Sequence, residues 1–432
     1  MMTKQIVFII SVVITLAVFS YTVLKIAALF RLTKSFPTRN YIKRFGIMLK
    51  VAFGQTKIFR MPVLGFMHAL VFWGFCLIII GSIEMIIDGI LGLDKSLAFL
   101  DNVYKFITAS GDVFAFIIFV AIILFMGRRV ILHVKRFTGV EMTHKSHLDA
   151  FIALTLILLL MITLLGINTF YCALQPSEIK GVYPVSIYLS ALFSGMDKIT
   201  LSLLLEINWW AHILLIFLFA NILPYSKHFH VFLSVPNVFL SRLDPLGKLP
   251  NMDNVTKEVK LMINPETAFT SVPTDTVPSR FGVKDAEDVN WKNYLDSLSC
   301  TQCGRCTSVC PANITGKKLS PRKLMMDLRA RMKEKGPGLI KKGKDYSDNK
   351  SFNKDYFSPE EIWACTTCNA CAKECPININ HPTLIVDLRR YLVMEEASAP
   401  SGLKTIFTNI ENNGAPWQFS PEDRLLWAKD ML

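Results

Sequence analysis

Long apolar runs alternate with short polar segments over the first 240 residues of the chain. Five of these runs are long enough to cross about 30 Å of hydrocarbon as helices, and they lie near residues 5–30, 61–92, 112–134, 148–174 and 207–235. The first run is too long for the core of a signal peptide and has no small-residue cleavage site after it. The pattern therefore predicts a bundle of five transmembrane helices over residues 1–240.

The pattern changes after residue 240. Residues 241–290 are rich in Pro, Asn, Asp and Thr and show little periodicity, which is typical of a linker. Residues 291–432 have a mixed composition, and Ser-Pro pairs begin three short apolar patterns at Ser320, Ser358 and Ser420. Ser is favoured as a helix N-cap and Pro as the first helical residue. We therefore expect an all-α protein with a mostly helical second domain.

Charge is distributed unevenly over the predicted loops. Residues 31–60 hold eight Lys and Arg and no acid, and residues 128–147 are also basic, whereas residues 93–112 and 175–206 are balanced or slightly acidic. Because basic loops stay on the cytoplasmic side, the N-terminus is expected outside. Five spans then place the second domain in the cytoplasm of a bacterial-type inner membrane.

The net charge of +13 does not indicate nucleic-acid binding, because its distribution follows the membrane topology. Residues 1–240 hold 20 Lys and Arg against 10 Asp and Glu, whereas residues 241–432 hold 27 against 24. The basic excess therefore belongs to the membrane half, and we expect no nucleic-acid partner.

Eight of the ten cysteines fall in two similar motifs, "CTQCGRCTSVCP" at 300–311 and "CTTCNACAKECP" at 365–376. The spacing C-x2-C-x2-C-x3-C-P is that of bacterial ferredoxins with two [4Fe–4S] clusters, in which the fourth cysteine of each run binds the other cluster. Structural zinc sites more often use two separated CxxC pairs. The predicted ligand sets are Cys300, Cys303, Cys306 and Cys375 for the first cluster, and Cys310, Cys365, Cys368 and Cys371 for the second.

Histidines within the spans are the second candidate site. A polar ring in a span is costly unless it is used, and such rings occur at His68, His212, His228 and His230. His212 and His230 are eighteen residues apart, which on one helix is five turns, or about 27 Å along a shared face. Pro224 lies between them and bends such a helix. His228 points elsewhere and is expected to contact lipid headgroups.

Two of these histidines are expected at the same depth in the membrane. His68 and His230 both lie near the cytoplasmic ends of their spans and are expected to hold one b-type haem between them, although both could instead be interfacial histidines without metal. His212 has no histidine at its level in the second span. It is therefore left as a candidate for a second haem or for a quinone site.

The outer ends of the spans carry weaker signals. Trp209 and Trp210 begin the fifth apolar run and fit an interfacial aromatic belt. Glu84 and Asp88 lie in the outer part of the second run, where they serve either a proton path or the interface.

Both halves resemble known families. The membrane half resembles the gamma (cytochrome b) subunit of respiratory nitrate reductase, with five spans, a His in the second, and a His pair eighteen residues apart before "SVP". The soluble half resembles the iron–sulfur region of heterodisulfide-reductase-like and electron-transfer-flavoprotein:quinone oxidoreductase-like membrane proteins, on the blocks "CGRC", "LSPRKL", "ACTTCNAC" and "NNGAPWQFSPEDRLLWA". The resemblance implies that His68 and His230 bind the haem nearer the cytoplasm.

The function expected from these observations is electron transfer between a cytoplasmic redox partner and membrane quinone, through two [4Fe–4S] clusters and haem b. The cysteine-rich CCG domains of the resembled proteins are absent after Cys375, so we expect a separate CCG-domain iron–sulfur protein, a flavoprotein similar to electron-transfer flavoprotein, or both, as partners. They would dock on the C-terminal part of residues 291–432. The alternative is a non-catalytic membrane anchor, stabilised by metal, for a cytoplasmic partner. No catalytic residue is assigned.

Overall fold

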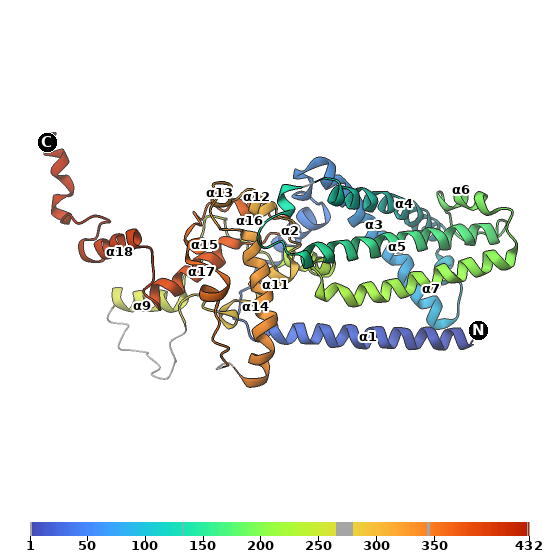
Figure 1. Cartoon of the computed structure of the whole chain (residues 1–432), viewed down its shortest axis with the longest axis horizontal. Helices are drawn as coiled ribbons and strands as arrows, with labels where there is room; N and C mark the ends of the chain where they lie inside the picture. The colour runs from blue at the N-terminus through green and yellow to red at the C-terminus, as the bar shows by residue number, and fades with distance from the viewer. Residues whose placement is uncertain (1, 133, 265–279, 344–345, 430, 432) are drawn as a thin grey trace.

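A computed structural model describes residues 2–431 except 133, 265–279, 344–345 and 430. Over these residues the chain is helical, apart from an isolated β-bridge between Lys34 and Asn290. A bundle of long helices forms one end of an elongated molecule, and a group of short helices forms the other (Figure 1). The all-α fold expected from the sequence is confirmed.

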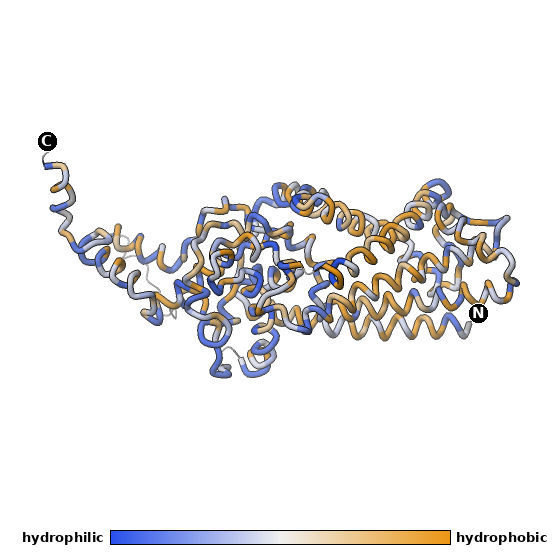
Figure 2. The backbone as a smooth tube through the Cα atoms, turned by 45° about the horizontal axis from the view of Figure 1, so that its top comes forward, coloured by the Kyte–Doolittle hydropathy of each residue, from blue (hydrophilic) through white to orange (hydrophobic). Residues whose placement is uncertain are grey.

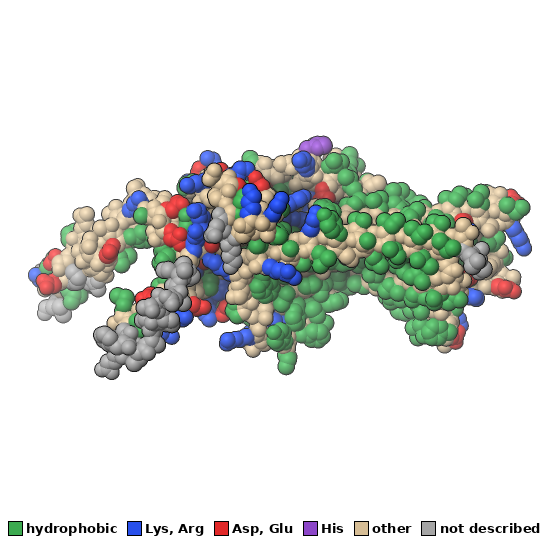
Figure 3. All heavy atoms as spheres, turned by 90° about the horizontal axis from the view of Figure 1, so that it is seen from below, with side chains coloured by type: hydrophobic (Ala, Val, Ile, Leu, Met, Phe, Trp, Pro, Cys, Tyr) green, Lys and Arg blue, Asp and Glu red, His purple; other side chains and the backbone are tan. Residues whose placement is uncertain are grey.

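Five of the described helices are long and apolar enough to cross a membrane. They are α1 (Met2–Phe30), α3 (Pro62–Leu91), α4 (Asn102–Val130), α5 (His144–Leu174) and α7 (Lys198–Ile222). Hydrophobic residues follow these helices along the bundle (Figure 2), and their side chains cover most of its visible surface between two charged ends (Figure 3). The predicted bundle of five spanning helices is therefore present.

Two spans differ from the apolar runs that predicted them. Helix α4 begins ten residues before its run, because polar residues in its first turns, such as Tyr104 and Asp112, are buried. Helix α7 ends at Ile222, since Pro224 has no N–H with which to continue it. His212 and His230 therefore lie on different helices, and the expected common face five turns long is wrong.

Short helices connect the spans at both ends. At the end that faces the soluble domain these are α2 (Tyr41–Met48), η1 (Leu49–Phe53), η2 (Ile58–Arg60), η4 (Lys135–Phe137), η6 (Leu223–Tyr225), η7 (Lys227–Phe229) and α8 (His230–Phe239). At the far end they are η3 (Ser96–Leu100), α6 (Ser186–Ser190) and η5 (Ala191–Phe193). Helix α5 packs between α4 and α7 and is the most buried span.

The soluble domain consists of many short helices around one core. They are α9 (Asp253–Ile263), η8 (Ala286–Asp288), α11 (Trp291–Ser299), α12 (Arg305–Ser308), α13 (Pro311–Ile314), α14 (Pro321–Lys342), η9 (Phe352–Tyr356), α15 (Pro359–Trp363), α16 (Ala370–Glu374), α17 (His381–Met394), α18 (Ser401–Asn413) and η10 (Pro421–Ala428). All three predicted Ser-Pro helix starts are N-caps: Ser320 accepts from the Lys323 N–H, Ser358 forms a capping box with Glu361, and Ser420 begins a 3₁₀ helix.

The segment expected to be a linker is only partly one. Residues 265–279 lie outside the described part, but Val283, Ala286 and Val289 are buried in the core of the soluble domain. The apolar spacing of these three residues was too short to be recognised as a helix or a strand. The hydrophobic core of the soluble domain therefore includes residues between 280 and 290, which the sequence analysis assigned to the linker.

The two halves of the molecule share a hydrophobic core. Leu29 of α1 and Leu223 and Phe229 of the turns after α7 belong to the same buried cluster as the core of the soluble domain. The loop after α1 adds backbone hydrogen bonds, from the Lys34 N–H to the Val289 carbonyl at 2.8 Å and from the Trp291 N–H to the Lys34 carbonyl at 3.0 Å. These contacts set the soluble domain directly against the end of the bundle.

Candidate cofactor sites

The two cysteine motifs have the same backbone shape. In each motif the residues just before and just after the middle cysteine have positive φ: 57° and 74° at Gln302 and Gly304, and 53° and 61° at Thr367 and Asn369. This region disfavours ordinary L-residues, so its repetition at matching positions marks a specific loop. We name these loops the first cage (residues 300–306) and the second cage (residues 365–371).

Each cage directs backbone donors at its own thiols. The Thr367 N–H lies 3.4 Å from Cys365 Sγ, and the Gln302 N–H makes the equivalent contact with Cys300. Such N–H groups stabilise thiolates and tune cluster potentials. The loop geometry thus suits anionic sulfur inside the cage.

The fourth cysteine of each motif lies beside the other cage. Cys375 interacts electrostatically with Cys303 and Cys300, although about seventy residues separate them. The second set borders one cavity, which is lined by the sulfur-bearing residues Cys310, Cys365, Cys368 and Cys371. The two groups of four are therefore those that crossed ligation requires, and ligation itself stays a prediction.

Burial makes these thiols poor nucleophiles and good metal ligands. Burial, followed by the charges of neighbouring thiols, raises the pKa of Cys371 and of Cys375 to about 12. Metal binding must therefore displace protons from them. In the described residues, no three Cys, His, Asp or Glu side chains converge as ligands of one ion would. A cubane differs from a single ion because each thiolate binds its own iron, and the thiols around it can lie farther apart.

The first cage contacts the membrane bundle directly. The Lys57 Nζ, in the loop before α3, donates to the Cys375 carbonyl at 3.1 Å. Gly304 packs closely against the loop between α4 and α5. A Cβ atom at residue 304 would lie 2.5 Å from the Arg136 carbonyl oxygen. Helices α12 and α16, which follow the two cages, lie at this junction (Figure 1). In the second cage Cys368 is exposed, so that cage faces outward.

His68 and His230 lie together at this same end of the bundle. The two rings interact electrostatically, and His68 Nδ1 is buried without a hydrogen-bond partner. His230 Nδ1 is 3.3 Å from the Lys227 carbonyl, which leaves Nε2 available, as in metal-binding histidines. Burial, with His228 and His68 nearby, lowers the pKa of His230 to about 3, so the ring is in the neutral form that binds metals. If a haem is bound at this end of the bundle, His68 and His230 would be the residues that hold its iron.

The two other histidines have local partners. His228 is half-buried beside His230, with ring centroids 5.8 Å apart, and its Nδ1 is 3.1 Å from Ser226 Oγ; the expected headgroup contact stays a prediction. His212 Nδ1 is 2.9 Å from Thr163 Oγ1, and its ring also contacts the Leu160 carbonyl. These contacts tie α7 to α5 through Nδ1 and leave Nε2 available, so a second haem or a quinone site at His212 stays a prediction.

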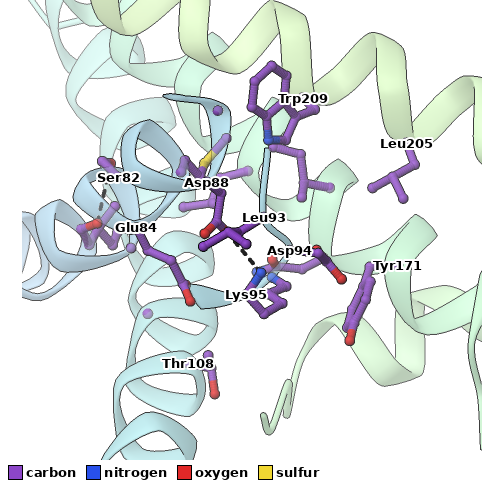
Figure 4. A pocket seen from close by; sticks show the side chains of 18 of the residues that line it. Ser82, Glu84, Asp88, Leu93, Asp94, Lys95, Thr108, Tyr171, Leu205 and Trp209 are labelled. Atoms are coloured by element: carbon purple, nitrogen blue, oxygen red, sulfur yellow. Dashed lines mark hydrogen bonds between the residues drawn. The ribbon is translucent and has the colours of Figure 1, made fainter. Parts of the chain in front are cut away.

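The far end of the bundle holds an open pocket of about 440 Å³, which is lined by apolar side chains together with polar and aromatic ones (Figure 4). Glu84 accepts a hydrogen bond from the Leu97 N–H at 3.0 Å, and Asp88 accepts from the Lys95 and Ser96 N–H groups at 2.9 and 3.0 Å. These carboxylates hold the η3 loop in place, which favours the interfacial interpretation over a proton path. Lys95 lies 4.8 Å from the centre of the Tyr171 ring.

Several charged residues near the cages had no role in the sequence analysis. Arg305 is only 6% exposed and lies between Cys303 and Cys306, while Lys57 and Arg136 come from membrane-side loops. The only sequence signal for Arg305 was its place inside a cage, where a charged side chain must lie close to the cluster. His381, buried with an unpartnered Nδ1, was also missed.

Comparison with known proteins supports the iron–sulfur interpretation of the soluble half. Residues 299–379 match the 4Fe-4S dicluster domain. The chain is 30% identical over 409 residues to the probable iron-sulfur-binding oxidoreductase FadF of Bacillus subtilis, covering 88% of this chain and 54% of the relative. It is 28% identical over 407 residues to the EtfAB:quinone oxidoreductase of Syntrophomonas wolfei, covering 88% and 53%.

A third relative matches a shorter part of the chain. A probable membrane-anchored ferredoxin of Chromohalobacter salexigens is 33% identical over 181 residues, which cover 38% of this chain and 27% of the relative. No solved structure matches the chain. The chain spans about half the length of the two relatives that it matches most extensively. It is thus similar, over most of its own length, to iron–sulfur oxidoreductases, and it carries a 4Fe-4S dicluster domain next to a bundle of membrane-spanning length.

Proposed function

We propose that this chain transfers electrons between a cytoplasmic redox partner and membrane quinone, using two [4Fe–4S] clusters and one b-type haem. The observation that carries the proposal is that the proposed cluster ligands and haem ligands lie near one another where the soluble domain meets the bundle. Lys57, which donates to the Cys375 carbonyl, lies in the loop that leads directly into α3, and His68 is near the start of that helix. Iron–sulfur and haem ligands thus meet at one end of the bundle.

The residues have distinct tasks in this proposal. Cys300, Cys303, Cys306 and Cys375 would hold one cluster, and Cys310, Cys365, Cys368 and Cys371 the other, while His68 and His230 would hold the haem. The bound groups would supply one-electron redox chemistry. The chain contributes ligands, N–H donors to sulfur, and a buried environment that keeps water from the first cage. His212 is not assigned to this haem.

Partner, quinone and topology are parts of the same proposal. An acceptor that reaches a haem inside the bilayer must be lipid-soluble, and one relative is named an EtfAB:quinone oxidoreductase. The exposed Cys368 makes the second cage the side at which a soluble flavoprotein or iron–sulfur protein would dock. The basic loops before α3 and α5 lie at the soluble-domain end of the bundle, which supports a cytoplasmic soluble domain and an outer N-terminus.

The proposal is tested on the purified full-length chain in detergent. Iron, acid-labile sulfide, zinc and haem are quantified, and the haem absorption bands are followed during reduction with dithionite and reoxidation with menadione. The expected result is brown protein with about eight iron atoms in clusters and a b-type haem that menadione reoxidises. A colourless zinc protein would overturn the proposal in favour of a membrane anchor. A haem that stays reduced would exclude quinone as the acceptor.

A further inference from the structure

Four basic side chains gather where the first cage meets the bundle. They are Lys57, Arg60, Arg136 and Arg305, named here the junction cluster. Charge interactions link Lys57 with Arg60 and Arg305, and Arg136 with Arg305. Among the described residues the carboxylate paired with this cluster is Glu374, which lies 3.0 Å from Arg305 Nε and 3.1 Å from Arg60 Nη1. The four basic side chains thus share the single carboxylate of Glu374.

Buried Arg305 and half-buried Arg136 each have a buried side-chain nitrogen without a hydrogen-bond partner. The Arg305 side chain is 7% exposed, its Nη1 donates to the Lys57 carbonyl at 3.1 Å, and its Nη2 is buried with no hydrogen-bond partner. Arg136 Nε is buried in the same state. An uncompensated buried charge costs several kcal/mol, and an unsatisfied buried donor in a native protein requires an explanation. The thiols Cys303 and Cys375 lie near these cations, but the unpartnered N–H donors of Arg305 and Arg136 have no acceptor in the described residues.

The position of the junction cluster indicates which anions it would bind. The charge of Arg305 acts on His68, and the charge of Arg136 acts on Cys303. Arg305 Nη1 reaches the Lys57 carbonyl and Arg136 Nη1 lies 3.0 Å from Met61 Sδ, so both side chains lie just before α3, the helix that carries His68. A haem carries two propionates on one edge, and a guanidinium fork matches a carboxylate in a bidentate pair. Propionates directed toward this polar end of the bundle would satisfy the unpartnered N–H groups.

We propose that Arg305, together with Arg136, binds the propionates of the haem held by His68 and His230. This inference rests on the proposed function. Because Arg305 belongs to the first cage, the soluble domain would supply part of the haem pocket. A single residue would then join the position of the first cluster to the position of the haem. The haem site would be complete only when the two halves of the molecule are docked.

The test compares the haem midpoint potential and haem content of purified full-length variants in detergent. Ferric haem carries one more positive charge than ferrous haem, so removal of a nearby cation favours the ferric state. Arg305→Gln and Arg136→Gln are therefore expected to lower the midpoint potential or to lose haem, and Arg305→Lys to give an intermediate result. The matched control is Arg60→Gln, because Arg60 also pairs with Glu374 but is 37% exposed. Because solvent screens its charge, this variant should keep its haem and shift the potential less than Arg305→Gln does.

The outcomes separate this inference from the proposed function. EPR spectra of the reduced clusters check that each variant retains its cages. If Arg305→Gln and Arg136→Gln both keep the wild-type potential and haem content, the inference is overturned while the proposed function stands. If the wild type contains no haem, both fail together. If Arg305→Gln does not accumulate, titrations of Arg305→Lys and Arg136→Gln decide the result.

Discussion

The place of each cysteine in the fold, and not its distance along the chain, decides which thiols lie around one cluster site. Each cage turns back on itself through two residues of positive φ, so its three cysteines face one space. The fourth cysteine follows a short helix and points away from its own cage. It meets the other cage because α12 and α16 pack against each other.

The first prediction concerns Cys375. Cys375→Ser should lose or alter the cluster held by Cys300, Cys303 and Cys306, because its thiol lies beside theirs and not within the second cage. EPR of the reduced protein, with iron quantified, measures the change: up to half of the iron should be lost. The control is Cys172→Ser, a buried thiol in a span, which should change neither signal. An altered second cluster with an intact first one would refute crossed ligation.

The second prediction concerns the haem ligands. His68→Ala and His230→Ala should each abolish the same b-type absorption signal, because bis-histidine ligation requires both rings. His212→Ala is the matched control within the bundle, since its ring is bonded to Thr163. It should keep the haem signal and lower the thermal stability of the detergent-solubilised protein, by about 1 kcal/mol for the lost hydrogen bond.

Either of two results would contradict this assignment. Retention of the haem signal in His68→Ala or His230→Ala would show that another residue, such as the neighbouring His228, is the ligand. Loss of a distinct second haem signal in His212→Ala would show that the ring binds a cofactor and that its contacts with α5 are secondary.

At the scale of elements, the two cages differ because one of them faces a membrane loop. Gly304 and Asn369 occupy the same position with similar positive φ, yet only Gly304 lies against the η4 loop. In the second cage the Asn369 side chain donates to the Thr367 carbonyl at 2.8 Å, and Asn is among the few residues that tolerate this backbone region. The motif "CGRC" therefore reflects docking, and "CNAC" reflects backbone conformation alone.

The third prediction uses this pair. Asn369→Ala measures the cost of the backbone conformation, about 1 kcal/mol. Gly304→Ala should cost more, by about 1–3 kcal/mol for forced contact with the Arg136 carbonyl. Thermal unfolding in detergent and the protease sensitivity of the 131–143 loop measure the difference. Equal effects of the two substitutions would mean that this loop moves aside and that Gly304 is not a docking residue.

At the scale of the whole molecule, the soluble domain and the bundle form one packed body. Their shared core and the buried Arg322–Glu141 ion pair, at 2.7 Å, cross the junction between them. The basic loops that indicate the cytoplasmic side are the same loops that contact the cages. If the expected orientation holds, charge in these loops serves both membrane orientation and docking.

The fourth prediction is the topology. A fluorescent protein fused after Leu432 should fluoresce, because it folds on the cytoplasmic side. Alkaline phosphatase inserted between α5 and α7 should show enzymatic activity, because that loop is expected on the outer side. Alkaline phosphatase inserted in the 131–143 loop is the control and should be inactive. The reverse pattern would place the cages outside and exclude a cytoplasmic partner.

The sequence by itself determined the features that depend on local spacing. Five apolar runs predicted the spans, Ser-Pro pairs predicted three N-caps, and cysteine spacing predicted two equivalent cages, because each signal lies within a few turns of chain. The end of α7 before His230 was less predictable. Proline excludes one hydrogen bond locally, but whether a helix kinks or ends there depends on what packs around it.

Only the tertiary structure decided which side chains satisfy one another across the chain. Thr163 on α5 gives His212 Nδ1 a partner, and N–H groups of the η3 loop satisfy Glu84 and Asp88. Conversely, Arg305 became a candidate haem-binding residue because the junction leaves its Nη2 without a partner. Burial and pairing are properties of the folded neighbourhood, and no spacing along the chain encodes them.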